Sequence, residues 1–391
     1  RERQRQREMD RWRETETQTE TERQTRWRRW ELSTDSKLLG ECGGVETTTG
    51  GMTALHSSTA DNRDPLTVRT VEEAVTLAPY LLGFQPTESL LMIVADDGAA
   101  CQGFVARADL DGLESAPAMN AFAARVGPLA GQGRTVVLAF SKDQDRGMVT
   151  LASAVEAMKG MNIGDAAWTD GEYWRSIFCD EQGCGENHRF VPDPTIAAEA
   201  VYRGLTVLPS RTSLVDKLSG PGRTCDPDTR RLLANSRRRL SRKDDNTVEV
   251  RCQALFESGD EINDAVVTEL AVAVQRSDVA RRLWMSMERA DASRWLRIWS
   301  RAVEIIPDRM APAPLSLCGL AGWLSGEGAV AAVCARRCEF MVGTADLPAA
   351  LTVIVDAFVP PKLWDVMDHD PAVIAHPFLE EQVDEEINLS A

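Results

Sequence analysis

The sequence predicts an α/β module with a mixed sheet and antiparallel hairpins, followed by an all-α helical module. Three observations lead to this prediction. From about residue 65, short apolar runs typical of strands alternate with helical patterns. Gly220-Pro221-Gly222 then interrupts the chain, and only helical patterns follow it. A length of 391 residues is enough for two domains, which we expect at 65–220 and 226–365.

The first module contains two expected hairpins. Asp97-Gly98 and Asp170-Gly171 are dipeptides typical of hairpin turns, and apolar runs stand on both sides of each. Helical patterns separate these runs, which indicates layers of helices against a sheet. The expected strands are 89–95, 101–109, 134–140 and the two arms of 166–176, and the expected helices are 71–82, 118–129, 150–159, 194–203 and 213–218.

The second module is expected to be helical throughout. Trp295 and Trp299 stand four residues apart, so they lie on one helix face and are expected to anchor a core between helices. Gly322, Gly326 and Gly328 favour a tight turn between two closely packed helices. The expected helices are 228–243, 261–274, 276–288, 291–305, 314–324, 327–340 and 346–357.

Both ends of the chain differ from the globular part. Residues 1–51 begin with a stretch composed almost entirely of Arg, Glu, Gln and Thr, a composition that cannot bury a core. We expect a disordered or non-native extension there, with the native start at Met52. Residues 371–391 end in carboxylates and are expected to form a solvated acidic tail, with His369 and His376 in or beside it.

Charge and composition exclude several classes of protein. A net charge of −16 makes nucleic acid an unfavourable partner for the chain as a whole. No apolar run approaches the roughly 18–20 residues that span a bilayer, so no membrane association is expected. The nine cysteines are odd in number and irregularly spaced, which argues against a secreted disulfide framework and favours the reducing cytoplasm. Neither glycine-rich phosphate-loop motif occurs.

Five short motifs run through the globular part. They are LLGFxP at 81–86, WRSxxC at 174–179 with a second cysteine at 184, PSR at 209–211, LAGWLSGEGA at 320–329 and VPPxxW at 359–364. Together they resemble the actinobacterial "domain of unknown function 4192" family, which also occurs in actinobacteriophages, over roughly 65–365. The chain departs from that family at Gly185, where the family tends to have Cys-Pro or Pro, and at Glu327, where it favours Asp. The family has no established activity, so the resemblance supports the fold and leaves the function open.

Cys179, Cys184 and His188 form a C-x4-C-x3-H pattern in one loop. Thiolate and imidazole are the ligands that zinc prefers, and this spacing lets one loop supply several of them. Cys225 or Glu181 would be the fourth ligand. Because the second ligand pair of a typical structural zinc site is missing, two inert thiols are the leading alternative, and a redox pair is the other.

Ser210, Arg211 and Thr212 precede or begin an expected helix. Ser210 or Thr212 would cap that helix by accepting a backbone N–H. The functional alternative is an anion site, in which the helix N-terminus and Arg211 hold a phosphate or carboxylate. Capping accounts for the hydroxyl residues, although it does not account for the arginine.

Two further charged features have a structural explanation that we prefer. Arg107 and Asp109 alternate on one strand, so they share a face and are expected to form an ion pair. Residues 230–243 hold seven basic residues in an otherwise acidic chain. A charged, exposed helix that docks on the protein's own acidic surface is preferred there over a phosphate-binding stripe, because no aromatic residue interleaves.

The leading functional hypothesis is a non-enzymatic binding or regulatory protein that contacts a protein partner through the helical module. The alternative is a small-molecule or nucleotide-processing enzyme whose site lies at the junction of the two modules, lined by Cys179, Cys184, His188 and Arg211. No catalytic residue is predicted, since His188 is the single histidine of the expected globular part and no nucleophile elbow occurs.

Overall fold

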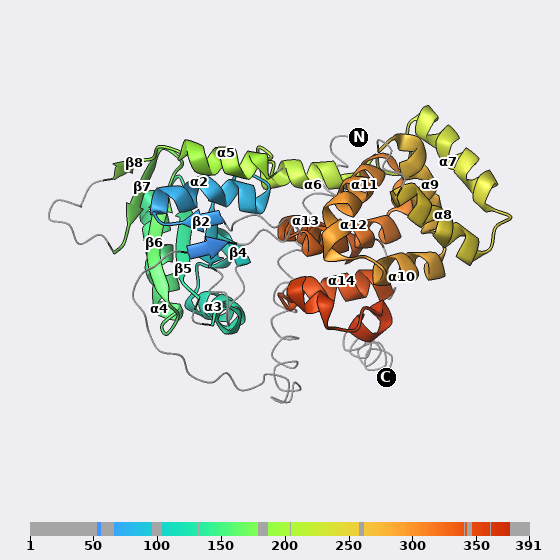
Figure 1. The fold of residues 1–391 in the computed structure, drawn as a ribbon. Helices are drawn as coiled ribbons and strands as arrows, with labels where there is room; N and C mark the ends of the chain where they lie inside the picture. The colour runs from blue at the N-terminus through green and yellow to red at the C-terminus, as the bar shows by residue number, and fades with distance from the viewer. Residues whose placement is uncertain are drawn as a thin grey trace, which may run out of the picture. The chain divides into compact units, whose positions relative to one another are not determined.

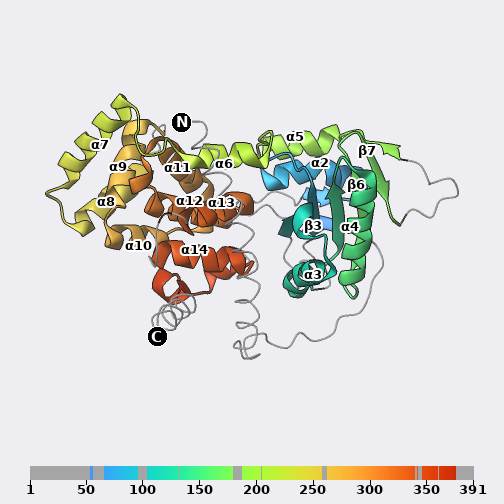
Figure 2. The same ribbon diagram turned by 180° about the vertical axis from the view of Figure 1, so that it is seen from behind.

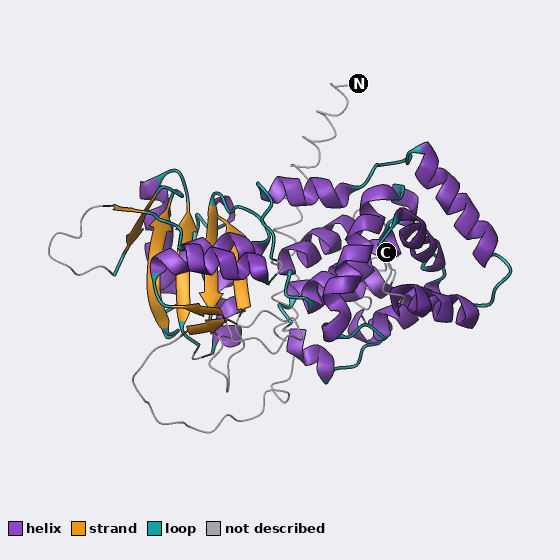
Figure 3. Cartoon of the chain, turned by 45° about the horizontal axis from the view of Figure 1, so that its top comes forward, coloured by secondary structure: helices purple, strands orange, loops and turns teal. Residues whose placement is uncertain are grey.

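The structure is a computed structural model that describes residues 53–55, 66–95, 104–131, 133–178, 187–203, 205–257, 262–339, 341, 346–359 and 361–375. All of them belong to the compact unit of residues 51–391. We call the described residues from 53 to 203 the α/β region and residues 211–375 the helical region. Figure 3 shows every described strand in the first region and only helices in the second, so the predicted fold class is confirmed. The exact module limits stay predictions.

The α/β region is built on a six-stranded sheet with the order β4-β3-β5-β6-β7-β8 (Figure 1). β5 and β6 run parallel, and every other neighbouring pair of this sheet is antiparallel. Both expected hairpins are therefore present, as β3–β4 and β6–β7. A separate pair, β1 (Thr53–Leu55) and β2 (Leu66–Val68), is antiparallel. The six strands are β3 Ser89–Val94, β4 Phe104–Asp109, β5 Thr135–Phe140, β6 Ile163–Thr169, β7 Tyr173–Ser176 and β8 His188–Arg189.

One edge of this sheet collects the carboxyl ends of three strands. The register pairs Ser89 with both Asp109 and Phe140, and Phe140 with Thr169. Asp109, Phe140 and Thr169 are the last residues of β4, β5 and β6, whereas Ser89 is the first residue of β3. We call this end of the sheet the carboxyl edge. Open α/β sheets usually bind their ligands outside such an edge.

Helices cover both faces of the sheet. α3 (Ala116–Ala130) and α4 (Gln144–Ala157) share a core with Leu90 and Met92 on one face, seen from the front in Figure 2. α2 (Val71–Leu82) and α5 (Pro194–Tyr202) share a core with Leu91 and Ile93 on the other. Successive side chains of a strand point to opposite faces, so all of β3 is buried.

Helix α4 begins six residues before the predicted start at residue 150. Asp143 caps it by accepting the Arg146 backbone N–H at 3.1 Å. This first turn contains Gly147, a weak helix former. Trp168 of β6 requires that glycine, because a Cβ at residue 147 would lie 2.2 Å from the Trp168 ring.

The helical region contains one helix that the sequence did not predict, α8. This helix buries only Val248 and Cys252 and therefore shows no clear apolar stripe. The remaining helices agree with the expected positions to within a few residues. The unpredicted α8 spans Asp245–Glu257, and the others are α6 Arg211–Ser219, α7 Pro227–Leu240, α9 Asp264–Ala273, α10 Ser277–Met285, α11 Ala292–Ile305, α12 Pro312–Leu324, α13 Gly328–Glu339 and α14 Asp346–Asp356.

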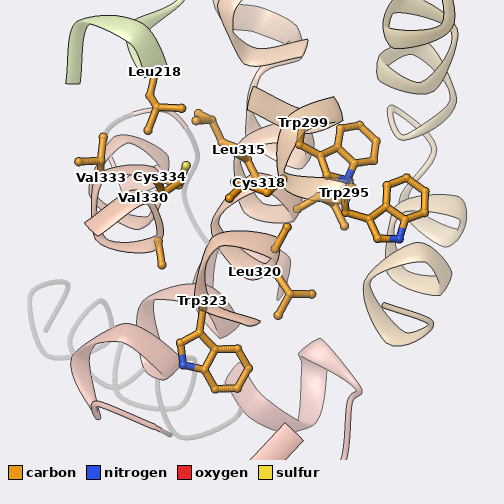
Figure 4. Close-up of a cluster of buried hydrophobic side chains, with 14 of the residues drawn as sticks. Leu218, Trp295, Trp299, Leu315, Cys318, Leu320, Trp323, Val330, Val333 and Cys334 are labelled. Carbon is orange, nitrogen blue, oxygen red and sulfur yellow. The ribbon is translucent and has the colours of Figure 1, made fainter. Parts of the chain in front are cut away.

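Helix α12 is the centre of the helical region and packs against α11, α13 and α14. Its residues from Pro314 onward are all buried, which is typical of a helix that is apolar on every side. Figure 4 shows Trp295 and Trp299 of α11 beside Leu315, Cys318 and Leu320 of α12. The two tryptophans are buried and stack at 5.8 Å between ring centroids, so their predicted role as core anchors is confirmed.

Residues 361–375 continue the helical core. Trp364, in the 3₁₀ turn Pro361–Asp365, is buried, donates to the Met287 carbonyl at 2.8 Å and meets the rings of Trp284 and Trp323 edge-on. The His369 ring stacks on Trp364 at 4.1 Å. The prediction that His369 lies in a solvated tail is therefore wrong, because this aromatic stacking holds it against the fold.

Candidate functional site

The carboxyl edge holds a network of charged side chains centred on Glu88. This residue immediately precedes β3. Its φ is +41°, a left-handed backbone conformation that residues other than glycine rarely adopt. Its carbonyl accepts the Leu110 N–H at 3.0 Å directly after β4, which holds the strained backbone in place. Strained residues tend to gather where a protein binds or reacts.

The Glu88 carboxylate is bound by the segment that joins β5 to α4. It accepts the Ser141 hydroxyl and the Lys142 backbone N–H, each at 3.0 Å, and the Arg146 guanidinium at 3.1 Å. A carboxylate is favourable there because backbone N–H groups and the positive end of a helix dipole face it. Glu88 thus joins the start of β3 to the first turn of α4.

Arg146 serves three carboxylates at once. Besides Glu88 it pairs with Asp111 and, at 2.9 Å, with Glu114. The hydrogen bond to Asp111, followed by the attraction of both further carboxylates, raises the pKa of Arg146 above its ordinary value. One guanidinium cannot neutralise three carboxylates, so this part of the edge keeps a negative charge and would attract a cationic group.

A second group of polar side chains at the carboxyl edge forms its hydrogen bonds and ion pairs within the protein. Arg107 donates to the Ser89 hydroxyl at 2.7 Å and pairs with Asp109, so the predicted ion pair is confirmed. Its guanidinium also lies 5.7 Å from the ring centroid of Phe84. Next to it, Lys142 donates to the Asp170 carbonyl at 2.6 Å.

The predicted anion-binding residues lie at the start of α6. Ser210 is the N-cap, and its hydroxyl accepts the Ser213 N–H at 3.1 Å. Arg211 and Thr212 are the first two residues of the helix. The capping role of Ser210 is thus established, and anion binding by Ser210, Arg211 and Thr212 stays a prediction.

The predicted metal ligands are described only in part. Cys179 and Cys184 lie outside the described residues, whereas His188 lies on β8 and stacks on Trp174 at 4.7 Å. Within the described part of the chain, no three His, Cys, Asp or Glu side chains are grouped for a metal ion. Zinc binding by Cys179, Cys184 and His188 stays a prediction.

The five described cysteines are all buried and unbridged. Cys225, suggested as a fourth zinc ligand, is buried directly before α7. Burial raises the pKa of Cys252 and of Cys338 to about 12, which keeps both as neutral thiols. These cysteines behave as small apolar core residues.

Four large apolar side chains are exposed on two segments that meet at His369. They lie on residues 361–375 and at the end of α10, and His369 joins these two segments because its ring nitrogens contact the carbonyls of Trp364 and Met285. We call this group the apolar patch. Its exposed fractions are 36% for Met285, 44% for Leu363, 80% for Val366 and 53% for Val373.

Sequence reasoning missed both the Glu88 network and the apolar patch. The Glu88 network could have been found from the polar run Ser141-Lys142-Asp143. This run comes directly after a buried strand and therefore places polar groups at a carboxyl edge. The patch gave no signal, because isolated apolar residues in an expected surface segment are common.

Comparison with known proteins gives one match. The family described as Domain of unknown function (DUF4192) matches residues 72–361. No curated protein and no solved structure matches the chain. Among the described residues, each helix is too short or too polar to cross a membrane.

Proposed function

Since the chain belongs to the family Domain of unknown function (DUF4192), whose description assigns no activity, we propose a function from the chain's own surface. The protein is a non-enzymatic binding or regulatory protein that engages a partner protein through its helical region. It acts in the cytoplasm, a location that the irregular cysteine spacing favours. The observation that carries this proposal is the apolar patch.

The backbone beneath the apolar patch is fixed by several contacts. Trp364 of the same segment is buried, Arg281 pairs with Asp370, and Arg289 pairs with Asp365 at 2.9 Å. Side chains on a fixed backbone lose less conformational entropy on binding than side chains on a loop. Exposed apolar groups on such a frame are typical of protein interaction sites.

The experiment places a charge in the patch. In Val366→Asp, we expect folding to be unchanged, because Val366 is 80% exposed. A protein captured by the wild-type chain is identified, purified and titrated calorimetrically, and the variant should bind it at least about tenfold more weakly. Val149→Asp is the matched control, since Val149 is 67% exposed on α4. Equal affinity of both variants would sink the proposal. Sedimentation velocity would show whether the partner is a second copy.

A second candidate is a small-molecule or nucleotide-processing enzyme. Its best support lies at the carboxyl edge, where the strained Glu88 and the three carboxylates around Arg146 could hold a cationic substrate group. A thermal-shift screen with polyamines, amino sugars and nucleotides tests it. A compound that stabilises the wild type but not Glu88→Gln would favour the enzyme over the binding protein.

A further inference from the structure

Helix α7 presents an exposed basic face. Thr229, Leu233, Ser236 and Leu240 are its buried residues, and α7 packs against α9. Its opposite side is exposed and runs along the outside of the helical region (Figure 1, yellow). We call the exposed cations of this helix and of the turn after it the basic face. They are Arg230, Arg231, Arg237, Arg238, Arg239, Arg242 and Lys243.

Most of the basic face has no carboxylate partner. Arg231 pairs with Asp228, and Arg239 pairs with Glu269. Among the described residues, the other five cations of the basic face form no ion pair. Arg230, Arg237 and Arg238 instead donate to a backbone carbonyl, to the Met310 sulfur and to the Asn235 side chain. This is unexpected in a chain with 60 acidic and 44 basic residues, because carboxylates are abundant elsewhere on it.

Helix stability explains only part of the basic face. Cations in the last turn, such as Arg237 and Arg238, interact favourably with the negative end of the helix dipole. Arg230 and Arg231 stand in the first half of the helix, where a cation gains nothing from the dipole. Arg231 bonds Asp228 and Arg230 bonds the Cys225 carbonyl, each through one nitrogen of its guanidinium, so the remaining donors of both side chains can bind an anionic partner.

The basic face is held in a fixed position. Asp226 caps the N-terminus of α7 by accepting the N–H groups of Asp228 and Thr229, each at 2.9 Å. At the other end, Arg276 donates to the Leu240 carbonyl at 2.8 Å. A fixed array of charges does not have to be ordered when a ligand binds, which favours affinity.

Carboxylates limit the length of the basic face. Asp226 and Asp228 lie at its N-terminal end, and Asp244 and Asp245 follow its C-terminal end. At 1.5 Å per residue, the 14 residues of α7 span about 21 Å. A nucleic-acid strand would continue past both ends and meet these carboxylates, and the basic face offers no aromatic side chain for base stacking. A short acidic protein segment fits between the two ends.

We propose that the basic face of α7 docks a short acidic segment of a partner protein, at a surface distinct from the apolar patch. The probe is fluorescein-labelled polyglutamate of about six residues, which in an extended conformation matches the length of the face. Its anisotropy is measured with the full chain at about 50 mM salt, where charges are weakly screened, and again at about 300 mM. A labelled DNA duplex of the same charge is measured in parallel.

The test compares two double charge reversals. R231E/R238E changes the middle of the basic face, whereas R189E/R297E changes two exposed arginines outside it. Polyglutamate should bind the wild type and the R189E/R297E control equally at low salt, and R231E/R238E at least about tenfold more weakly. Circular dichroism checks that both variants are folded.

Three results would overturn the proposal. The first is polyglutamate binding that R231E/R238E leaves unchanged, or no binding at all. The second is tighter binding of the duplex than of polyglutamate, because it would assign the basic face to nucleic acid. The third is binding that emerges only after removal of residues 376–391, because it would assign the face to the chain's own acidic segment. None of these results depends on Val366, the residue that tests the proposed function. The docking of an acidic segment on α7 can therefore be refuted while the proposed function is upheld, and the reverse.

Discussion

Arg146 Nη1 lies 3.1 Å from Glu88 Oε2, although 58 residues separate them in sequence. The pair joins the residue before β3 to the first turn of α4, and Glu88 contributes it from a left-handed backbone conformation. The carboxyl edge is therefore organised by one long-range ion pair. The positive φ of Glu88 allows the backbone strain at this residue to be measured with substitutions.

Glu88→Gly should be more stable than Glu88→Ala by about 1 kcal/mol. Both variants lose the carboxylate and its bonds to Ser141, Lys142 and Arg146. Only glycine adopts the φ of +41° without a steric penalty. Urea unfolding of the two variants measures the difference. Equal stability would show that the backbone relaxes once the carboxylate is gone.

Gly319→Ala should destabilise the protein by about 1–3 kcal/mol. A Cβ at this position of α12 would lie 2.4 Å from Leu351 Cδ2 and 3.0 Å from Cys334 Cβ, both of which belong to buried residues. Gly328→Ala is the control, because no atom lies within 4 Å of its Cβ position and alanine favours helix. A Gly319→Ala variant as stable as this control would contradict the close packing.

Removing the two arginines around Glu269 should cost more stability than removing the carboxylate. Glu269 is 3% exposed and pairs with Arg239 of α7 and Arg251 of α8. R239A/R251A leaves a buried charge without a partner and should cost about 3 kcal/mol. Glu269→Gln leaves two half-exposed arginines that water can solvate, so about 1 kcal/mol is expected. Thermal unfolding that ranks the two variants in reverse would refute this account.

Asp370 should stabilise the protein in a pH-dependent way. The hydrogen bond from Arg281 holds its pKa below the ordinary value of 3.8. A lowered pKa means that the stabilisation is complete above about pH 4 and disappears as pH falls through the folded-state pKa. The stability difference between wild type and Asp370→Asn should thus be constant near neutral pH and shrink in acid. Urea midpoints over this pH range measure it, and a difference unchanged at pH 3 would contradict the ion pair.

Cys252 and Cys338 should resist alkylation in the folded protein. Burial raises their pKa from 9.0 to about 12, so the reactive thiolate is absent near pH 8. Their thiol form adds stability that is complete below pH 9 and is lost between there and about pH 12. Mass spectrometry after iodoacetamide treatment should find both unmodified in buffer and modified in urea. Equal labelling in both conditions would show that the thiols are accessible.

Local patterns predicted much of the fold. Alternation and turn residues located the β6–β7 hairpin, because Asp170-Gly171 and its apolar flanks are adjacent in sequence. The strands β3 and β4 also pair as expected, and the expected turn at Asp97-Gly98 lies outside the described residues. Four-residue spacing identified Trp295 and Trp299 as core anchors on one helix face, and the structure adds that their rings stack. The cap of α6 was narrowed to Ser210 or Thr212, because a capping hydroxyl acts on its own helix, and the structure selects Ser210.

Features that depend on distant residues were not predictable in this way. The need for glycine at position 147 depends on Trp168, whose ring lies against it. Helix α8 has a weak apolar stripe because Glu269 and Arg251, a charged pair, form part of its contact with α9. The Glu88 network required the order of the strands, which no local pattern contains. The role of Arg146 in pairing three carboxylates, and that of His369 in stacking on Trp364, likewise depend on contacts between residues from different elements.

Strand β8, at one end of the sheet, is only two residues long and pairs with β7 at Tyr173 and Trp174. A strand this short offers few backbone groups to an incoming chain, and Arg189 adds a charge to it. At the opposite end, β4 carries Arg107 and Asp109. Short or charged edge strands oppose the addition of strands from other molecules. The sheet should therefore resist growth into intermolecular β-structure, and refolding at high protein concentration should yield soluble monomeric sheet rather than fibrous aggregate.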